Sequence, residues 1–309
     1  MSPYLIFILS LVTLIYSSNL IIDNSKHIAL KFNISKLIIG VTIVAFGTSL
    51  PELIVGIFSS IQEKGDIALS NVIGSNVANI GLVLGILALI KPINININEK
   101  LNYNLAACLL STFSVVLIIY LYDGIYFWSG SLLILVFLLY MFYLFSHYSR
   151  DNSFLDSESQ KFNFICIIKL IIGFVCLSFG TDYFIKSVVE ISNQFGFTNN
   201  IAISMSLVAF GTSVPELTTS LVAVFKKEQG LAIGNIIGSN IFNILLVAGI
   251  SSIANPINIE FILIKYHLYF MVFLTVFFIF SIYLLKKINR IISFIFICTY
   301  FVFLYINFS

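Results

Sequence analysis

One polar block occurs twice in the chain. VAFGTSLPEL (Val44–Leu53) recurs as VAFGTSVPEL (Val208–Leu217), and NVIGSNVANI (Asn71–Ile80) recurs as NIIGSNIFNI (Asn235–Ile244), each time 164 residues later and without a gap. Apolar composition alone produces scattered matches of Ile and Leu, but not matched Gly, Thr, Ser, Pro, Glu and Asn in one register. The sequence is therefore an internal duplication, and its fold must be built from two related halves.

The composition of both halves is that of a membrane protein. Of the 309 residues, 59% are apolar and only 10% are charged, whereas soluble domains carry about 25% charged residues. The 16 basic and 14 acidic residues nearly cancel, which excludes a nucleic-acid binder. Because a helix needs about 20 apolar residues to cross a bilayer, we expect an all-α, polytopic membrane protein with about ten spans.

Apolar windows of membrane length predict ten transmembrane helices. They are Tyr4–Ile22, Leu37–Ile61, Ile67–Ile90, Tyr103–Tyr122, Tyr126–Phe145, Phe164–Val189, Ile201–Phe225, Leu231–Ala254, Leu268–Leu285 and Ile291–Phe308. The least apolar connection, Ser146–Asn163, separates two sets of five. We therefore expect a five-helix repeat over residues 1–147, a connecting loop over 148–163 and a second five-helix repeat over 164–309.

The basic residues predict how these helices are oriented. With the N-terminus outside, all but three of the 16 lysines and arginines fall in or beside cytoplasmic segments, the exceptions being Lys64, Lys186 and Lys265. We therefore expect a multi-pass protein of the plasma membrane with both termini outside and a cytoplasmic central loop. Since five helices per half is an odd number, the halves enter the membrane in opposite directions, as inverted repeats of secondary transporters do.

Each half places one glutamate at membrane depth, Glu52 in the second span and Glu216 in the seventh. A charged side chain there costs about 2.5–3.5 kcal/mol even on the scale derived from insertion experiments. No Lys, Arg or His lies in the middle of any predicted span, so the remaining partners are a bound ion, a proton or water. The duplicated glutamates therefore indicate a functional site.

Oxygen-bearing residues precede each glutamate. A threonine and a serine stand four and three residues before it, on its own helical face; they are Thr48 and Ser49 before Glu52, and Thr212 and Ser213 before Glu216. A proline beside each glutamate lacks an N–H and frees main-chain oxygens around residues 45–48 and 209–212. Bare carbonyls at membrane depth are tolerated only where they line a cavity or bind something.

A second polar stripe lies in the third and eighth spans. Its residues repeat at every fourth position, so that hydroxyls and amides share one face; they are Asn71, Ser75 and Asn79, then Asn235, Ser239 and Asn243. Such residues also serve plain helix packing in membranes, but their duplication beside a duplicated glutamate favours a site. The whole set offers only oxygen, which hard cations such as Ca²⁺ select, and lacks the thiolates and imidazoles that suit zinc or copper.

The charge of this site predicts coupled transport. An empty site with two ionised glutamates is a dianion that resists enclosure in a low dielectric. One Ca²⁺ neutralises it, and so do several Na⁺ or two protons. Competition between cations for one pair of carboxylates makes an antiporter and not an enzyme, with the cations as cargo and no resident cofactor.

At these residues the chain resembles the calcium/cation antiporter superfamily, and its sodium/calcium exchanger family in particular, whose two alpha repeats match residues 44–80 and 208–244. The resemblance implies Na⁺-driven Ca²⁺ transport, in which the first and sixth spans slide past the remaining helices. It also implies a cluster of ion sites, with Glu52 and Glu216 as shared central ligands and Thr48 and Thr212 beside them. The flanking Na⁺ sites would use Ser49, Ser213, Ser75 and Ser239, together with the carbonyls of Ala45 and Ala209.

Several mechanisms stay open. Many relatives carry Asp where this chain has Asn79 and Asn243, which weakens the case for K⁺ co-transport and leaves the ion stoichiometry open. Proton-exchanging relatives carry G-N-x-x-E in place of G-T-S-x-P-E, so calcium/proton exchange is the alternative mechanism. A calcium-selective channel uses the same kinds of oxygen, whereas an intramembrane hydrolase at Ser49 or Ser213 would need a base at that depth, and the sequence has no His or Lys there. The oligomeric state does not follow from the sequence.

Overall fold

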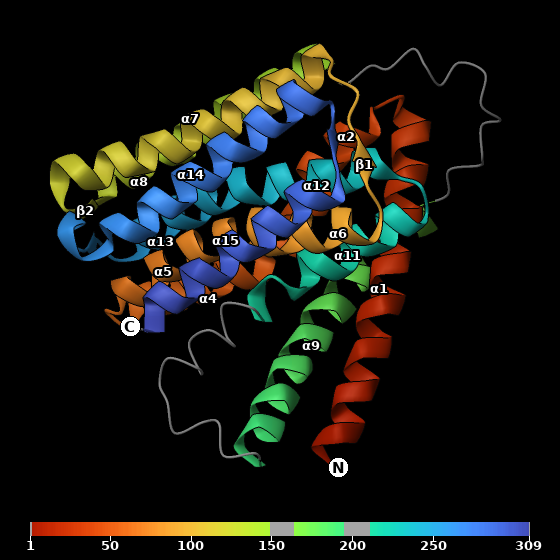
Figure 1. The fold of residues 1–309 in the computed structure, drawn as a ribbon, viewed down its shortest axis with the longest axis horizontal. Helices are drawn as coiled ribbons and strands as arrows, with labels where there is room; N and C mark the ends of the chain where they lie inside the picture. The colour runs from red at the N-terminus through yellow and green to blue at the C-terminus, as the bar shows by residue number, and fades with distance from the viewer. Residues whose placement is uncertain (1, 149–163, 195–210, 309) are drawn as a thin grey trace.

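The chain folds almost entirely into helices (Figure 1); the structure is a computed structural model that describes residues 2–148, 164–194 and 211–308. In the N-terminal half the elements are α1 (Pro3–Phe32), α2 (Lys36–Ile39), η1 (Gly40–Val44), α3 (Ala45–Thr48), α4 (Leu50–Ile61), α5 (Gly65–Ala78), η2 (Asn79–Leu84), α6 (Gly85–Ile90), β1 (Ile93–Asn94), α7 (Glu99–Tyr122), β2 (Gly124–Ile125) and α8 (Phe127–Tyr148). In the C-terminal half they are α9 (Ile165–Gln194), α11 (Val214–Phe225), α12 (Gln229–Phe242), η5 (Asn243–Val247), α13 (Ala248–Ala254), β3 (Ile257–Asn258), α14 (Phe261–Leu285), β4 (Lys287–Ile288) and α15 (Arg290–Phe308). The η elements are π-helical turns.

Local sequence sets where the long helices begin and end. Asn98 caps the start of α7, because its side-chain oxygen accepts the Leu101 N–H at 2.8 Å. Helices α1, α7 and α14 each end at a residue in the left-handed conformation, which are Asn33, Asp123 and Lys286. The turns between spans are therefore short and place successive helices next to one another.

Seven helices of the described chain are long and apolar enough to cross a membrane. A further span is broken: the segment Lys36–Thr48 and helix α4 meet at an angle of 46°. Helices α11 and α15 are apolar but shorter, and the predicted span Ile201–Phe225 lies partly outside the described residues. The protein is thus a helical polytopic membrane protein with seven or eight spans in its described part, and the count of ten stays a prediction.

Two strand pairs relate the halves. Strand β1 pairs antiparallel with β4, with Ile93 opposite Ile288, and β2 pairs antiparallel with β3, with Ile125 opposite Ile257. Strands β1 and β3 lie within the two copies of the tetrapeptide PINI. Each copy therefore pairs with a strand of the other half, and β1 and β2 lie at opposite ends of the molecule (Figure 1).

The most buried helices form the centre of the bundle. The membrane windows of α5–α6 and α12–α13 are each 83% buried, whereas those of α1 and α9 are 33% and 28% buried. Helices α1 and α9 lie side by side at the edge (Figure 1). The two helices that carry the glutamates, α4 and α11, pack against α5 and α12 respectively. The polar motifs are thereby held inside the bundle, away from lipid.

Candidate cation site

Both glutamates lie just after a break in their span. At Ser49 and Ser213 the backbone leaves the helical conformation, with φ of −89° and −87° and ψ of 9° and 0°. Helices α4 and α11 begin at the next residue, so Glu52 and Glu216 lie in their first turns, and both side chains are fully buried. The unpaired N–H groups of a helix start favour negative charge, which gives each carboxylate a suitable position inside the membrane.

The two carboxylates come from different halves and interact electrostatically with each other. Ser49, from the N-terminal half, donates its hydroxyl to Glu216 Oε1 at 3.0 Å. Ser239 donates to the same oxygen at 3.3 Å. The break at Ser49 therefore aims this hydroxyl at the glutamate of the other half, although an unbroken helix would have placed it beside Glu52.

Hydroxyl pairs connect the halves in a reciprocal way. Thr48 Oγ1 lies 3.4 Å from Ser239 Oγ, and Ser75 Oγ lies 3.4 Å from Thr212 Oγ1. The two contacts join equivalent positions of the repeat, with the roles of the halves exchanged. The threonines that precede the glutamates thus meet the serines of the second polar stripe.

The asparagines extend the same polar core. Asn79 and Asn243 each begin a π-helical turn, η2 and η5, and such turns are frequent at functional sites. Asn79 Nδ2 donates to Asn240 Oδ1 at 3.1 Å. Asn71 Nδ2 donates to the Glu52 carbonyl at 3.2 Å, and Asn235 Oδ1 accepts the Thr48 hydroxyl at 3.0 Å.

Several buried oxygens on these helices have no hydrogen-bond donor among the described residues. They are both carboxylate oxygens of Glu52, Oε2 of Glu216, Oγ of Ser213, and Oδ1 of Asn76, Asn79 and Asn243. Buried polar atoms in native proteins are paired as a rule, so a group of unpaired oxygens needs an explanation. Hard cations bind through such atoms, with 6–8 oxygens in the case of Ca²⁺.

The donor set also argues against softer metals. The described part of the chain contains no group of three or more His, Cys, Asp or Glu side chains that could hold a metal ion. Beyond two carboxylates, the available donors are hydroxyl, amide and main-chain oxygens. This composition suits Ca²⁺ or Na⁺ and does not suit zinc or copper.

Sequence reasoning missed two residues of this core. Asn76 and Asn240 are both buried, and neither side-chain polar atom of Asn76 has a partner within the described residues. The signal was present, since both positions are asparagine in the duplicated GSN motif.

The structure describes one of the two predicted main-chain ligands. The Ala45 carbonyl accepts the Ser49 N–H at 3.0 Å and the Thr48 hydroxyl at 3.3 Å, so it is not left bare. Ala209 lies outside the described residues.

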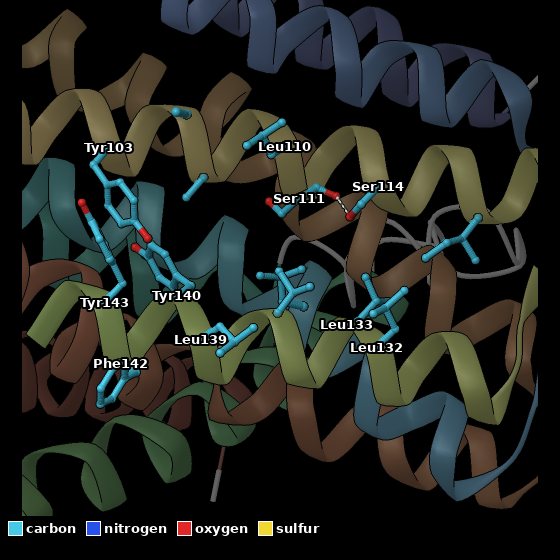
Figure 2. A pocket seen from close by; sticks show the side chains of 15 residues that line it. Tyr103, Leu110, Ser111, Ser114, Leu132, Leu133, Leu139, Tyr140, Phe142 and Tyr143 are labelled. Atoms are coloured by element: carbon cyan, nitrogen blue, oxygen red, sulfur yellow. Dashed lines mark hydrogen bonds between the residues drawn. The ribbon is translucent and has the colours of Figure 1, made fainter. Parts of the chain in front are cut away.

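A groove of about 730 Å³ lies elsewhere, between α7 and α8 (Figure 2). Its wall is mostly aliphatic and aromatic, with Leu110, Leu132 and Tyr140 among the lining side chains. Its lining contains no carboxylate, so nothing in it balances the charge of a cation.

Comparison with known proteins identifies the family of the chain. A family profile described as "Sodium/calcium exchanger protein" matches residues 2–146 and again 165–309. The chain is 36% identical over 267 residues to the putative antiporter CaxA of Alkalimonas amylolytica, covering 81% of each chain. It is 29% identical over 301 residues to the sodium/calcium exchanger MaX1 of Methanosarcina acetivorans, covering 83% of this chain and 84% of that one.

The fold is likewise similar to a solved one. A structure of the sodium-calcium exchanger NCX_Mj, soaked with Na⁺ and Ca²⁺, superposes with a TM-score of 0.84 at 30% identity and covers 98% of each chain. The likeness extends over both halves and is not confined to the polar motifs. The chain therefore belongs to the sodium/calcium exchanger protein family.

Proposed function

We propose that this protein exchanges Na⁺ for Ca²⁺ across the membrane by alternating access, and that both ions bind at a site built on Glu52 and Glu216. The observation that carries the proposal is the pair of buried carboxylates from opposite halves, surrounded by oxygens that lack donors within the described residues. Two negative charges in a low dielectric require cations. One Ca²⁺ or a set of Na⁺ supplies the same charge, which is the basis of exchange.

The proposed ligands are the oxygen-bearing residues of the duplicated motifs. Glu52 and Glu216 are shared by all bound ions, and the hydroxyls of Thr48, Thr212, Ser49, Ser213, Ser75 and Ser239 surround them, with Asn79 and Asn243 at the π-helical turns. The main-chain oxygens of Ala45 and Ala209 complete the proposed set. The hydrogen bonds between these residues support the grouping.

The proposed topology is that of an inverted repeat. Residues 1–147 and 164–309 form two five-helix units joined by a cytoplasmic loop, in the plasma membrane and with both termini outside. The reciprocal pairing of β1 with β4 and of β2 with β3 supports the relation between the units. An inverted repeat places its binding site where the units meet.

Vesicles containing the purified protein test the proposal. When loaded with Na⁺, they should accumulate labelled Ca²⁺, and Glu52→Gln or Glu216→Gln should abolish uptake while the amount of folded protein stays the same. Glu99→Gln, which changes an exposed glutamate at the start of α7, is the matched control and should keep full uptake.

Two results would contradict Na⁺/Ca²⁺ exchange. Uptake that ignores Na⁺ and follows a pH gradient would identify a calcium/proton antiporter. Uptake that continues after the counter-ion is removed from the far side would identify a channel.

A further inference from the structure

Helices α1 and α9 form a unit of their own. They pack on each other along most of their length, and their buried residues correspond at a shift of 163: Ser10, Leu14, Ser17 and Ile21 in α1, and Gly173, Leu177, Gly180 and Phe184 in α9. A Cβ added at Gly173 would meet Ile21 at 2.9 Å, so the two helices are in close contact. They are therefore equivalent members of a pair.

The pair contacts the remaining helices unequally. Helix α1 packs along α11, where Ser18 Oγ lies 3.4 Å from Thr219 Oγ1. The equivalent contact would join α9 to α4, and these two fully described helices make no comparable contact. Because the halves share their sequence pattern, the reciprocal arrangement is also available to the chain. The structure therefore holds one of two arrangements.

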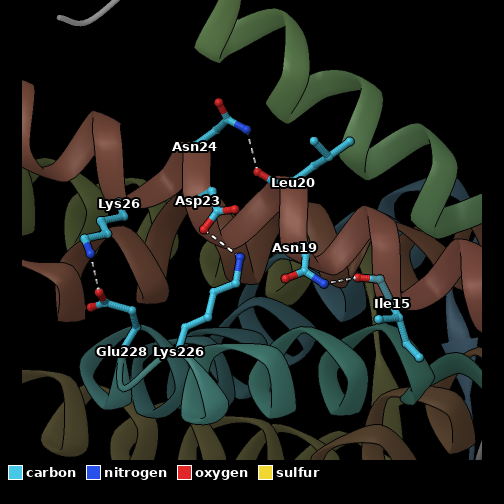
Figure 3. A network of polar contacts seen from close by, with 8 residues as sticks. All are labelled: Ile15, Asn19, Leu20, Asp23, Asn24, Lys26, Lys226 and Glu228. Carbon is cyan, nitrogen blue, oxygen red and sulfur yellow. Dashed lines mark hydrogen bonds and ion pairs between the residues drawn. The ribbon is translucent and has the colours of Figure 1, made fainter. Parts of the chain in front are cut away.

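Ion pairs fasten α1 at one end. Asp23 pairs with Lys226 at 2.6 Å, and Lys26 pairs with Glu228 at 3.0 Å (Figure 3). We call these four residues the α1 clasp. They join α1 to the turn between α11 and α12, and Glu228 is the most enclosed of them, with 6% of its side chain exposed.

The other end of the pair lacks a clasp. Lys186 of α9 corresponds to Asp23 at the same shift of 163, but it pairs with Asp182 on its own helix at 2.7 Å. Among the described residues, no ion pair joins α9 to the turn between α4 and α5. In this structure, ion pairs among the described residues therefore fasten only the α1 end of the pair.

We propose that the α1 clasp is a conformational latch that holds α1 against the α11–α12 turn and must open before α9 takes the equivalent place beside α4. In the proposed topology the clasp lies at the cytoplasmic end, so the latched arrangement closes that side. The inference rests on the proposed function at one point only, which is that the two arrangements of α1 and α9 correspond to a site open to one side of the membrane or to the other.

The chain provides a matched control for the latch. Glu228 also pairs with Lys36 of α2 at 2.6 Å, but α2 and η1 are packed tightly on α12: a Cβ added at Gly40 would lie 2.6 Å from the Leu231 carbonyl oxygen. The pair Lys36–Glu228 therefore stays within one body, whereas Lys26–Glu228 crosses between two. Loss of Lys26 should release the latch, and loss of Lys36 should not.

Distances between spin labels test the proposal. Labels are attached at Lys31→Cys on α1 and Asn96→Cys on the main body, both exposed, in a variant without the four native cysteines and in lipid discs. One distance population represents the latched arrangement seen here, and a second represents the arrangement with α1 released. Lys26→Gln and Asp23→Asn should each raise the ratio of the released to the latched population by about twofold to fivefold, the range for partly exposed ion pairs. Lys36→Gln should leave the ratio unchanged.

A charge swap keeps the test decisive if a single variant is poorly folded. Asp23→Lys alone places two lysines together and should shift the ratio further, and Asp23→Lys with Lys226→Asp should restore it. An unchanged ratio in Lys26→Gln, or an equal shift in Lys36→Gln, would overturn the latch. The distance measurement needs no ion gradient and is therefore independent of the exchange assay. If the distance ratio shifts as expected but no exchange is seen, the proposed function is refuted and the latch stands. If exchange is seen but the ratio does not shift, the latch is refuted and the function stands.

Discussion

Glu52 and Glu216 occupy matching positions of the repeat, yet their hydrogen bonds differ. Oε1 of Glu216 accepts two serine hydroxyls, whereas neither oxygen of Glu52 has a donor within the described residues. The same holds for the amides, since Asn79 donates to Asn240 but the equivalent pair, Asn243 and Asn76, is unpaired there. Glu216 therefore has more protein donors than Glu52, but each carboxylate keeps at least one oxygen without a donor among the described residues.

The side chain of Asn243, unpaired among the described residues, provides a test of whether the charge of the site sets the number of Na⁺ ions bound. Asn243→Asp adds a third carboxylate to a buried site, so about one more monovalent cation is needed to neutralise it. The Hill coefficient for Na⁺ in the exchange assay should rise by about one, and the charge moved per cycle should change accordingly. Asn98→Asp, at an exposed helix cap, is the control for added charge, and a change in that variant would contradict the prediction.

Glu228 predicts a pH dependence of stability. Burial by itself raises the pKa of this carboxyl, but hydrogen bonds and charges from Lys36 and Lys26 outweigh burial and hold the pKa below its ordinary value. Because this pKa is lower in the folded state than in the unfolded chain, the ion pairs stabilise the folded state at pH values above the unfolded pKa of about 4.3. That stabilisation is lost as the pH falls through the folded pKa.

Thermal unfolding in detergent between pH 3 and 6 measures this effect. The unfolding temperature of the protein should fall as the medium is made more acidic than about pH 4, and Glu228→Gln should remove part of that decline. An identical pH profile in the variant would show that the ion pairs of Glu228 contribute nothing to stability.

Single residues differ in how far sequence could place them. Duplication identified the glutamates, the threonines and the serines, because it depends only on the order of residues. The partner of Ser49 could not be predicted, since helical spacing places it beside Glu52 and only the break aims it at Glu216. Asn76 was not predicted because it lies one residue outside the pattern of every fourth residue that defines the polar stripe.

At the scale of elements, the polar spans are not regular helices. Within the described part of the chain, three π-helical turns interrupt them, η1, η2 and η5, and the second span bends by 46°. Proline and glycine in the motifs predicted interruption, but the apolar windows gave only the outer limits of each span. The ends of a span depend on caps and turns, which are local in the sequence. The interruptions depend on packing against the other half of the protein, and a window of one span contains no information about that half.

Two glycines predict the stability of the central packing. A Cβ at Gly40 would lie 2.6 Å from the Leu231 carbonyl oxygen, and one at Gly234 would lie 2.4 Å from the Leu37 carbonyl oxygen. Both neighbours are backbone atoms that cannot turn away. Gly40→Ala and Gly234→Ala should therefore each lower the free energy of unfolding by about 1–3 kcal/mol, the cost of overpacking.

Gly230→Ala is the control in the same helix. Its nearest neighbour would be 3.5 Å away, which is ordinary contact. Denaturant or thermal unfolding in detergent compares the three variants. Helix propensity favours alanine over glycine at all three positions, so equal losses at Gly230 and Gly234 would show that close packing against the backbone does not decide the effect.

At the scale of the whole molecule, the two halves exchange partners. Each PINI strand pairs with the other half, and the strand pairs lie at opposite ends (Figure 1). These pairings secure the main body at both ends, whereas α1 and α9 are fastened to it at one end only. Sequence predicted the duplication that makes this symmetry possible. It could not predict which of the two arrangements the chain adopts, because both have the same sequence.

The unfastened end predicts a contact absent from this structure. Gln62, in the turn between α4 and α5, is equivalent to the clasp residue Lys226, and its neighbour Glu63 carries the carboxylate of that turn. Lys186 of α9 is equivalent to Asp23, so the charges at this end have the opposite signs. When α9 moves beside α4, the ammonium of Lys186 should approach the carboxylate of Glu63, and cysteines at these positions should form a disulfide in a variant without native cysteines.

If the latch controls the second arrangement, opening it should raise the yield of this cross-link, whereas a cross-link formed by random collision should not depend on the latch. Lys26→Gln releases α1 and favours the second arrangement, so it should raise the yield of the 63–186 disulfide by about twofold to fivefold. Cysteines at Glu63 and Asp182 form the control pair, since Asp182 is also exposed but lies one turn before Lys186, nearer the start of α9. Mass spectrometry of the cross-linked peptides measures both yields. If they respond equally to Lys26→Gln, the helix is merely mobile and the two ends are not coupled; a response confined to the Lys186 pair means that opening one end closes the other.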